Sequence, residues 1–498
     1  TRYDDLFVSA PRAAMAAGLP AVSVFLRFSL GLSGWKQDPW SRWSLRVNPS
    51  SGNLHPSEGY IVLGPGVVPN GAAGVLHYRP DQHAVERRAR VSDEAWLVLA
   101  AGLPPGAFFA AITSVSWREA WKYGERAFRY CQHDTGHAIA TMRIAAGIMG
   151  WHAQLVPGWN AADLGTLLGT DRDTDFAGAE REEPECLLVV SPQPVARFWR
   201  PDAAAVAGAF RRSEWTGRAS RLSPEHVAWD AVDVVAAATA GASAPSPADL
   251  VHVPPPPPAA GEPRLHPARL ATALVLHRRS AVAMSGDAHL DLPAFCSILR
   301  RLLPVDGAPW DALWWAPRLH VALFVHRVDG LDPGLYILAR DARALPLLRA
   351  ALREDFVWTR PPGIPADLDL FLLVPLDVRN IAGVLSCRQA TAADGFFSVA
   401  MVAEFDDGLA DHGASFYRNL FWEAGMIGQM LYLEAEAAGA RGTGIGCYFD
   451  DAVHDLFGMA DQRLQSLYHF TVGQPADDVR LQTEPGYGWE GGEAGSRK

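Results

Sequence analysis

Five consecutive prolines near the middle of the chain, Pro254 to Pro258, constrain its fold more than any other feature. They lie in a stretch rich in Pro, Ala and Gly. Successive proline rings impose an extended polyproline conformation that can continue neither a helix nor an inner strand. Such a segment acts as a semi-rigid spacer. We therefore predict a first domain over 1–240, a linker over 241–262 and a second domain over 263–498, each large enough for its own core.

The two parts carry related sequences. Residues 126–150 align with residues 418–442 without a gap, and the alignment places Gly136 on Gly428. Both segments have apolar residues at three- and four-residue steps and end in glycine, which predicts a long helix in each part. Their small residues would let a neighbouring helix approach closely. The chain therefore looks duplicated.

A second anchor pairs Gly74 with Gly334, 260 positions apart, whereas the helices are 292 apart in this alignment. The second part then holds 32 extra residues between about 340 and 414, and the glycines of 379–413 indicate either a lid or an ordinary surface excursion. Elsewhere, strand-like apolar runs alternate with helical ones in both parts. This pattern predicts an α+β fold with helices packed on mainly antiparallel sheets.

Composition excludes several classes of protein. The formal charge of −11 and the lack of Lys/Arg runs argue against nucleic-acid binding. No apolar stretch approaches the roughly 20 residues of a membrane span, and the first residues do not read as a signal peptide. Five widely spaced cysteines fit reduced thiols, not a disulfide framework or a zinc site. We expect a cytoplasmic protein that meets neither membrane nor nucleic acid.

Three short segments could meet a ligand. The turn 48–56 reads NPSSGNLHP, and its hydroxyls, amide and backbone N–H groups suit a polar heterocycle. The segment 278–280 reads RRS, a good grip for phosphate, although arginines also end helices for electrostatic reasons. The segment 442–447 reads GTGIGC, whose glycines allow close approach of the backbone to a ligand. Each segment alone also fits a plain structural role.

Together these segments resemble the FMN-dependent nitroreductase superfamily. PSSGNLHP is similar to its P-S-S-x-N-x-Q-P motif, with His55 in place of Gln. RRSAV is similar to its R-x-S-x-R motif, with Val282 in place of the second Arg, and the end of the chain through Arg480 resembles its closing signature. RVNPSSGNLHP with WKYGERAFRYCQHDTGH is more similar to the SagB-type dehydrogenase branch, above all to fused two-domain members related to azoline oxidases.

The resemblance implies a noncovalently bound FMN and names the residues that would hold it. Those residues are Pro49, Ser50, Ser51 and Asn53 at the flavin ring, Arg278, Arg279, Ser280 and Arg480 at the phosphate, and Gly444, Ile445 and Gly446 alongside.

Members of this superfamily are homodimers with one FMN at each interface. Here the first part has the turn but reads WHAQLV where a glycine loop would stand, and the second part has the phosphate motif and loop but no turn. We therefore predict two tandem nitroreductase-like domains that form an intramolecular pseudo-dimer with one FMN site, the symmetry-related site being lost. Since the sequence does not begin with Met, residues upstream of Thr1 are an alternative source of a phosphate motif for the first part.

The resemblance also assigns catalysis. Lys122 and Tyr123 correspond to a pair implicated in azoline oxidases as proton handlers beside the flavin, although such a pair is also common on protein surfaces. His55, His133 and His137 are weaker candidates for lining a substrate pocket. His133 and His137 share a helix face, but no third ligand is apparent, so we predict no metal site.

The predicted function is an FMN-dependent oxidoreductase that transfers two electrons to or from a small-molecule or peptide-derived substrate. Its electron partner would be NAD(P)H or oxygen. The alternatives are an NAD(P)H-dependent nitro- or quinone-reductase, and a degenerate scaffold that keeps the fold without redox activity. The protein would act as a monomeric pseudo-dimer or pair further as a homodimer.

Overall fold

The computed structural model describes residues 1–9, 12–67, 71–259 and 268–490. Two large antiparallel sheets dominate it, one in each half of the chain, with strand orders β7-β8-β6-β3-β4-β5-β9 and β12-β11-β10-β13-β15-β14. The first sheet contains β3 (Ser57–Leu63), β4 (Ala73–Arg79), β5 (Ala84–Val91), β6 (Phe108–Ser114), β7 (His152–Leu155), β8 (Glu183–Ser191) and β9 (Glu214–Trp215). The second contains β10 (Leu319–Val325), β11 (Gly334–Leu338), β12 (Leu370–Pro375), β13 (Phe397–Glu404), β14 (Arg441–Ile445) and β15 (Leu464–Gly473). The predicted α+β class with antiparallel sheets is confirmed.

Helices cover both faces of each sheet. In the first half they are α1 (Leu19–Ser29), α2 (Asp93–Leu99), α3 (Trp117–Tyr123), α4 (Ala127–Ile148), α5 (Ala161–Leu168), α6 (Ala203–Phe210) and α7 (Asp230–Ala238). After these come α8 (Pro247–Val251), α9 (Ala271–His277), α10 (Leu292–Leu302), α11 (Leu345–Ala351), α12 (Arg379–Leu385), α13 (Ala390–Asp394), α14 (Phe405–His412), α15 (Phe416–Ala437) and α16 (Asp450–Phe457). None of the helices in the described ranges has the length and apolarity that crossing a membrane requires.

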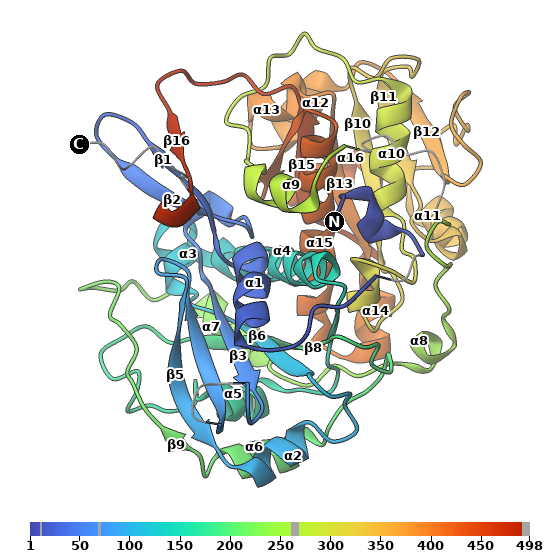
Figure 1. Ribbon diagram of the computed structural model, residues 1–498. Coiled ribbons are helices and arrows are strands. Elements are labelled where there is room, and N and C mark those ends of the chain that lie inside the picture. Colours follow the sequence, from blue (N-terminus) through green and yellow to red (C-terminus); the bar gives the residue numbers. More distant parts are fainter. Residues whose placement is uncertain (10–11, 68–70, 260–267, 491–498) are drawn as a thin grey trace.

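The long helices α4 and α15 lie between the two sheets (Figure 1). Nearly every residue of both helices is buried, and their side chains join one hydrophobic core that contains the inner faces of both sheets. Gly136 of α4 faces Gly425 of α15, and a Cβ atom on Gly136 would collide with the Trp422 carbonyl oxygen. The prediction that small residues allow a close helix approach is confirmed, and the contact joins the halves into one body.

The observed register corrects the predicted alignment. Both helices contain 22 residues, and their first residues, Ala127 and Phe416, are 289 positions apart. The glycines that follow them, Gly150 and Gly439, have φ values of +73° and +77° and keep the same spacing. The alignment of Gly136 with Gly428 is therefore wrong by three residues, and Gly136 corresponds to Gly425.

The extra residues of the second half do not lie in 379–413, the segment that its glycines indicated. The β-ladders pair Gly74 with Arg90 and Gly334 with Pro375, so the offset between halves rises from 260 to 285 between β11 and β12. That connection contains α11, whose Leu348 is buried in the core on the outer face of the second sheet. The extra residues therefore form a packed surface layer, and segment 379–413 is not the insertion.

Segments from each half cross to the other. Residues 1–9 lie against the second half, where Tyr3 donates a hydrogen bond to Glu434 (2.7 Å). From the other end, β16 (Gln482–Glu484) pairs with β1 (Leu32–Gln37), which pairs with β2 (Arg42–Arg46) in a small third sheet. In the predicted linker, Pro254–Pro258 form neither helix nor strand, but α8 precedes them; residues 260–262 lie outside the described residues.

Candidate functional site

A cavity of about 490 Å³ lies where the two halves meet. We call it the composite pocket and define it by the turn 49–53 of the first half and segments 278–280 and 443–447 of the second. Most of the residues predicted for the site line it, namely Pro49, Ser50, Ser51, Asn53, His55, Tyr123, His137, Arg278, Arg279, Ser280, Gly444, Ile445 and Gly446. Three predicted residues do not line it: Lys122, His133 and Arg480.

The turn 49–53 is held in an unusual backbone conformation. Gly52 and Asn53 both have φ values of +59°, a region that favours glycine and, among other residues, asparagine. The Asn53 amide donates to the carbonyl oxygen of Ser44 (2.9 Å), and the His55 N–H donates to the Ser50 hydroxyl (2.8 Å). A Cβ atom on residue 52 would strike the Tyr123 hydroxyl, so Tyr123 packs directly on the turn.

The opposite wall is cationic. Arg278 follows the end of α9 and donates to the carbonyl oxygen of Arg46 (3.0 Å), while its buried Nε atom has no partner in the part of the chain that the structure describes. Ser280 shares a hydrogen bond with the Tyr432 hydroxyl (2.8 Å). Burial lowers the pKa of both Arg278 and Arg279. With Lys36 and Arg46, four cationic side chains line the pocket against one carboxylate, Asp134, which favours an anionic ligand.

The glycine-rich segment leaves no space for side chains. A Cβ atom on Gly444 would strike the Tyr468 hydroxyl, and one on Gly446 would strike the Tyr130 ring. The Gly444 N–H donates to the Tyr432 hydroxyl (3.0 Å). Glycine is therefore required here by close packing of aromatic side chains from both halves.

Two buried carboxyl groups lie beneath the turn: Asp134, which follows His133 on α4 and is, like it, a candidate for lining the pocket, and Glu119, which sequence reasoning missed. Asp134 accepts hydrogen bonds from the N–H (3.1 Å) and hydroxyl (3.2 Å) of Ser51, but its second oxygen and both oxygens of Glu119 have no hydrogen-bond partner among the described residues. Burial raises the pKa of both groups, and the charge of Asp134 raises the pKa of Glu119 further. The pair therefore holds a proton at neutral pH. Glu119 stands four residues before Tyr123 on α3, a spacing that could have drawn attention to it.

Of the three histidines predicted for the pocket, two line it and one does not. His55 and His137 line the pocket, and His137 shares hydrogen bonds with Gln429 (3.2 Å) and the Tyr468 hydroxyl (3.2 Å). His133 instead hydrogen-bonds the Leu467 carbonyl oxygen (3.0 Å) and stacks on Tyr468, and it does not line the composite pocket. Burial lowers the pKa of His133 and His137 to about 3, which keeps both neutral. Across the described ranges, no three potential metal ligands converge.

Lys122 and Arg480 do not line the pocket. Lys122 is exposed, and its ammonium group lies 5.2 Å from the centre of the Tyr123 ring. The side chain of Arg480 is 78% exposed, pairs with Asp478 at 2.7 Å and does not line the pocket. Its neighbour Leu481 lines the pocket instead. The sequence identifies Lys122 and Arg480 as parts of motifs, but it does not show whether their side chains face the pocket.

A disulfide corrects the expectation of five reduced thiols. Cys387 and Cys447 are bonded, with Cα atoms 5.9 Å apart, and Cys447 lines the composite pocket. The other three cysteines are buried free thiols. Since 60 positions separate the bonded residues, no local spacing signalled the pair.

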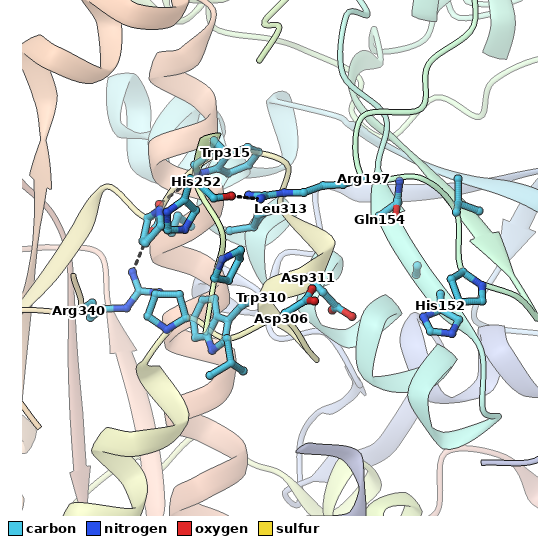
Figure 2. A pocket seen from close by; sticks show the side chains of 18 residues that line it. His152, Gln154, Arg197, His252, Asp306, Trp310, Asp311, Leu313, Trp315 and Arg340 are labelled. Carbon is cyan, nitrogen blue, oxygen red and sulfur yellow. Dashed lines mark hydrogen bonds and ion pairs between the residues drawn. The ribbon is translucent and has the colours of Figure 1, made fainter. Parts of the chain in front are cut away.

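Figure 2 shows a second cavity, of about 310 Å³, which we call the counterpart pocket. It is related to the composite pocket by the offset of 289, because β7 corresponds to β14 and Glu423 of α15 corresponds to Asp134 of α4. Its lining includes His152, Gln154, Arg197, His252, Trp310, Asp311, Trp315, Arg340 and Glu423.

Two of the three acidic residues that line the counterpart pocket, Glu423 and Asp311, are paired within the protein. Glu423 forms a fully buried ion pair with Arg340 and accepts from the Trp315 ring (3.2 Å). Asp311 is gripped by Arg143 through two hydrogen bonds of 2.7 Å. Leu155 and Pro157 stand where the composite pocket has Gly444 and Gly446. The counterpart pocket therefore lacks the glycine segment, and one of its two arginines, Arg340, is paired with Glu423.

Comparisons with known proteins agree with this architecture. Residues 363–474 match the nitroreductase family. The crystal structure of a candidate nitroreductase from Anabaena variabilis ATCC 29413 is similar over 92% of this chain and 88% of its own, with 19% identity and a TM-score of 0.65. The E. coli microcin synthetase McbBCD complex with truncated pro-MccB17 bound is 18% identical over 39% of this chain and 74% of its own. Its TM-score of 0.30 is too low to show a shared fold. No curated protein matches the chain.

The segment match and the first structural likeness agree on one architecture. Because the Anabaena structure follows this chain through both sheets, the likeness is not confined to the matched segment. The chain therefore has the nitroreductase fold, as two tandem domains that cover nearly its whole length.

Proposed function

We propose that the chain is an FMN-dependent oxidoreductase that transfers two electrons to or from a small-molecule or peptide-derived substrate. One observation carries the proposal: the turn 49–53 of the first half and the segments 278–280 and 443–446 of the second half line one cavity. Its volume lies within the range of roughly 300–1,000 Å³ typical of ligand pockets. The buried Nε of Arg278, which has no partner among the described residues, could donate a hydrogen bond to a ligand.

The residues present fit the two ends of FMN. Arg278, Arg279 and Ser280 would hold the phosphate, because guanidinium and hydroxyl donors form strong hydrogen bonds to phosphate oxygens. Ser50, Ser51 and Asn53 would meet the polar edge of the ring, and the 444–446 backbone would flank it. When bound, FMN supplies two-electron transfer by hydride.

The remaining residues would handle the proton. Hydride loss from a C–C or C–N bond also requires removal of a proton, and the Tyr123 oxygen on the pocket wall is placed to accept it as phenolate or, in the reverse direction, to return it as phenol. The carboxyl pair Glu119 and Asp134 would hold a proton beneath the turn. Lys122, which pairs with Tyr123 in the SagB-type resemblance, would act only through the tyrosine ring, since it lies outside the pocket.

We further propose that each half does the work of one subunit of a dimer, with 1–240 and 263–498 as the two domains and 241–262 as the linker. The SagB-type branch is the finer assignment, because His55 stands in the place of the usual Gln and Tyr123 packs on the turn. The protein would act in the cytoplasm, with NAD(P)H or oxygen as electron partner.

Flavin content tests the proposal. The purified full-length chain should be yellow, should carry close to one FMN per chain, and should lose its colour when a two-electron reductant is added. A colourless protein that takes up no FMN would contradict the proposal and favour a scaffold without redox activity. Reduction of the bound flavin by NAD(P)H alone would favour the nitro- or quinone-reductase alternative.

A further inference from the structure

The disulfide between Cys387 and Cys447 joins the wall of the composite pocket to a separate surface segment. Cys447 directly follows the glycine segment and lines the pocket, while Cys387 lies between α12 and α13. Two hydrogen bonds accompany the covalent link: Gln389 Nε2 donates to the Cys447 carbonyl oxygen (3.4 Å), and the Phe449 N–H donates to the Leu385 carbonyl oxygen (2.9 Å). Segment 385–389 therefore braces the chain just after Gly446.

The braced segment holds an unfavourable backbone conformation. Cys387 and Arg388 have φ values of +53° and +60°, so two successive residues with side chains occupy the left-handed region. Such residues persist only where their surroundings impose the conformation. The disulfide is the covalent constraint on this segment, and Gln389, two residues beyond it, lines the pocket.

The other side of the pocket wall is fixed by the first half. Arg126 donates to the carbonyl oxygen of Tyr448 (3.1 Å) and forms an ion pair with Asp450 (3.3 Å). Gly446 packs against the Tyr130 ring. Residues 446–450 are thus held on one side by first-half residues that do not depend on redox state, and on the other side by the disulfide.

Accessibility separates this pair from the other cysteines. Cys447 is exposed and Cys387 is half-buried, whereas Cys131, Cys186 and Cys296 are buried. A thiol reductant can reach the Cys447 sulfur directly, and exposed disulfides are the ones that exchange readily. Burial raises the pKa of all three free thiols, which makes them poor nucleophiles for competing exchange.

We propose that Cys387–Cys447 is a site of thiol–disulfide exchange with an external dithiol, and that its state controls how firmly segment 385–389 braces the composite pocket. One thiolate of the dithiol attacks the Cys447 sulfur, forms a mixed disulfide and releases Cys387 as a thiolate. The second thiol of the reductant then displaces Cys447. Two electrons and two protons pass from the dithiol to the protein, and the reductant leaves as a disulfide.

The consequence for the pocket follows from the strain. Reduction frees Cys387 and Arg388 to leave the left-handed region, which withdraws Gln389 from the pocket and loosens residues 446–449. The oxidised protein should therefore keep a ligand longer than the reduced protein. The exchange itself does not depend on the proposed function, but its effect on FMN release rests on it.

The test uses the full-length chain in two states, untreated and treated with dithiothreitol. Native alkylation with iodoacetamide followed by mass spectrometry should label Cys387 and Cys447 only after reduction and leave the three buried cysteines unlabelled. Hydrogen–deuterium exchange in 385–389 and 446–449 should become about tenfold faster on reduction, which corresponds to about 1.4 kcal/mol. Removal of the dithiol and addition of oxidised glutathione should restore both observations.

Variants separate a switch from a structural staple. Cys387→Ser should show fast deuterium exchange in 385–389 and 446–449 without any reductant. Cys296→Ser should behave like the unaltered protein. Should Cys387→Ser fail to fold, the reversible comparison in the unaltered protein still decides the matter. Equal deuterium exchange in the two states, or labelling of the pair before reduction, would overturn the proposal.

FMN release gives an independent reading. The reduced protein should release bound FMN about tenfold faster than the oxidised protein, by the same conversion. A protein that binds no FMN in either state would contradict the proposed function, while the difference in deuterium exchange would still support the switch. If deuterium exchange differs between the two states but FMN release does not, the proposed effect of segment 385–389 on the pocket would be overturned.

Discussion

The composite pocket and the counterpart pocket occupy related positions in a duplicated fold, yet they treat the same kind of buried carboxylate in opposite ways. Asp134 leaves one oxygen without a partner and faces a wall of cationic side chains. Glu423, its equivalent on α15, forms an ion pair with Arg340 and accepts a hydrogen bond from the ring N–H of Trp315. The composite pocket thus has a carboxylate oxygen without a partner among the described residues, which is costly unless a ligand uses it, whereas the counterpart pocket pairs its buried carboxylate internally and leaves Nη2 of Arg340 unpartnered instead.

The largest expected effect concerns Tyr123, which has no equivalent hydroxyl in the second half, where the offset of 289 places His412. Tyr123→Phe should slow reduction of the bound flavin by a substrate about 10²- to 10⁴-fold, because it removes a positioned proton-transfer group. Stopped-flow absorbance of the flavin measures this rate. Flavin content should not change. Lys122→Ala should cost far less, and equal losses for the two variants would contradict the placement of Lys122 outside the pocket.

The second prediction addresses the counterpart pocket. Arg340→Ala should lower the free energy of unfolding by about 3–5 kcal/mol, because it leaves Glu423 as a buried, unpaired charge. Chemical denaturation of the flavin-free protein measures the change. A loss below about 1 kcal/mol would show that this ion pair is not what closes the second site.

The third prediction addresses the cationic wall of the composite pocket. Arg278→Ala should weaken FMN binding about 10- to 100-fold, the loss expected for hydrogen bonds to a charged group. Arg197→Ala, in the counterpart pocket, is the matched control and should bind FMN normally. Titration with FMN, followed by fluorescence, distinguishes them. Similar losses in both variants would remove the distinction between the two pockets.

The fourth prediction follows from the raised pKa of Glu119. A carboxyl group whose pKa is higher in the folded protein binds protons preferentially in that state, so its contribution to stability is lost as pH rises above about 4.3, its value in unfolded chains. Glu119→Gln should therefore remove a decrease of up to about 1.4 kcal/mol per pH unit in the free energy of unfolding. Denaturation at several pH values tests this. Parallel pH profiles for both proteins would show that Glu119 is not protonated in the folded state.

The smallest effect is expected at Arg480. Because its side chain is exposed and paired with Asp478, Arg480→Ala should change FMN affinity by no more than about 0.5 kcal/mol. Isothermal titration calorimetry measures it. A loss as large as that of Arg278→Ala would mean that the C-terminal segment moves onto the phosphate when ligand binds.

The sequence predicted much of this molecule, because its main signals are local. The proline run, the helix periodicity and the turn 48–56 each fix a backbone shape over a few residues. The register of the duplication was misjudged because a chance glycine match, Gly136 with Gly428, outweighed the helix-ending pair Gly150 and Gly439. The composite pocket could be foreseen only as complementary motifs, since its walls come from segments more than 200 positions apart.

What escaped prediction depends on side-chain direction and on tertiary contact. Lys122 and Arg480 belong to recognisable motifs, but the rotation of a helix or strand decides whether such residues face a cavity. Glu119 belongs to no motif and gains its raised pKa only from burial beside Asp134. The disulfide joins residues 60 positions apart.

An experimental structure of the chain saturated with FMN would test the central claim most directly. The account predicts one FMN per chain, in the composite pocket, with its phosphate on 278–280 and its ring on 49–53. It also predicts a counterpart pocket free of FMN, with the Arg340–Glu423 pair intact. FMN in both pockets, or in the counterpart pocket alone, would contradict the claim that the two halves share a single site.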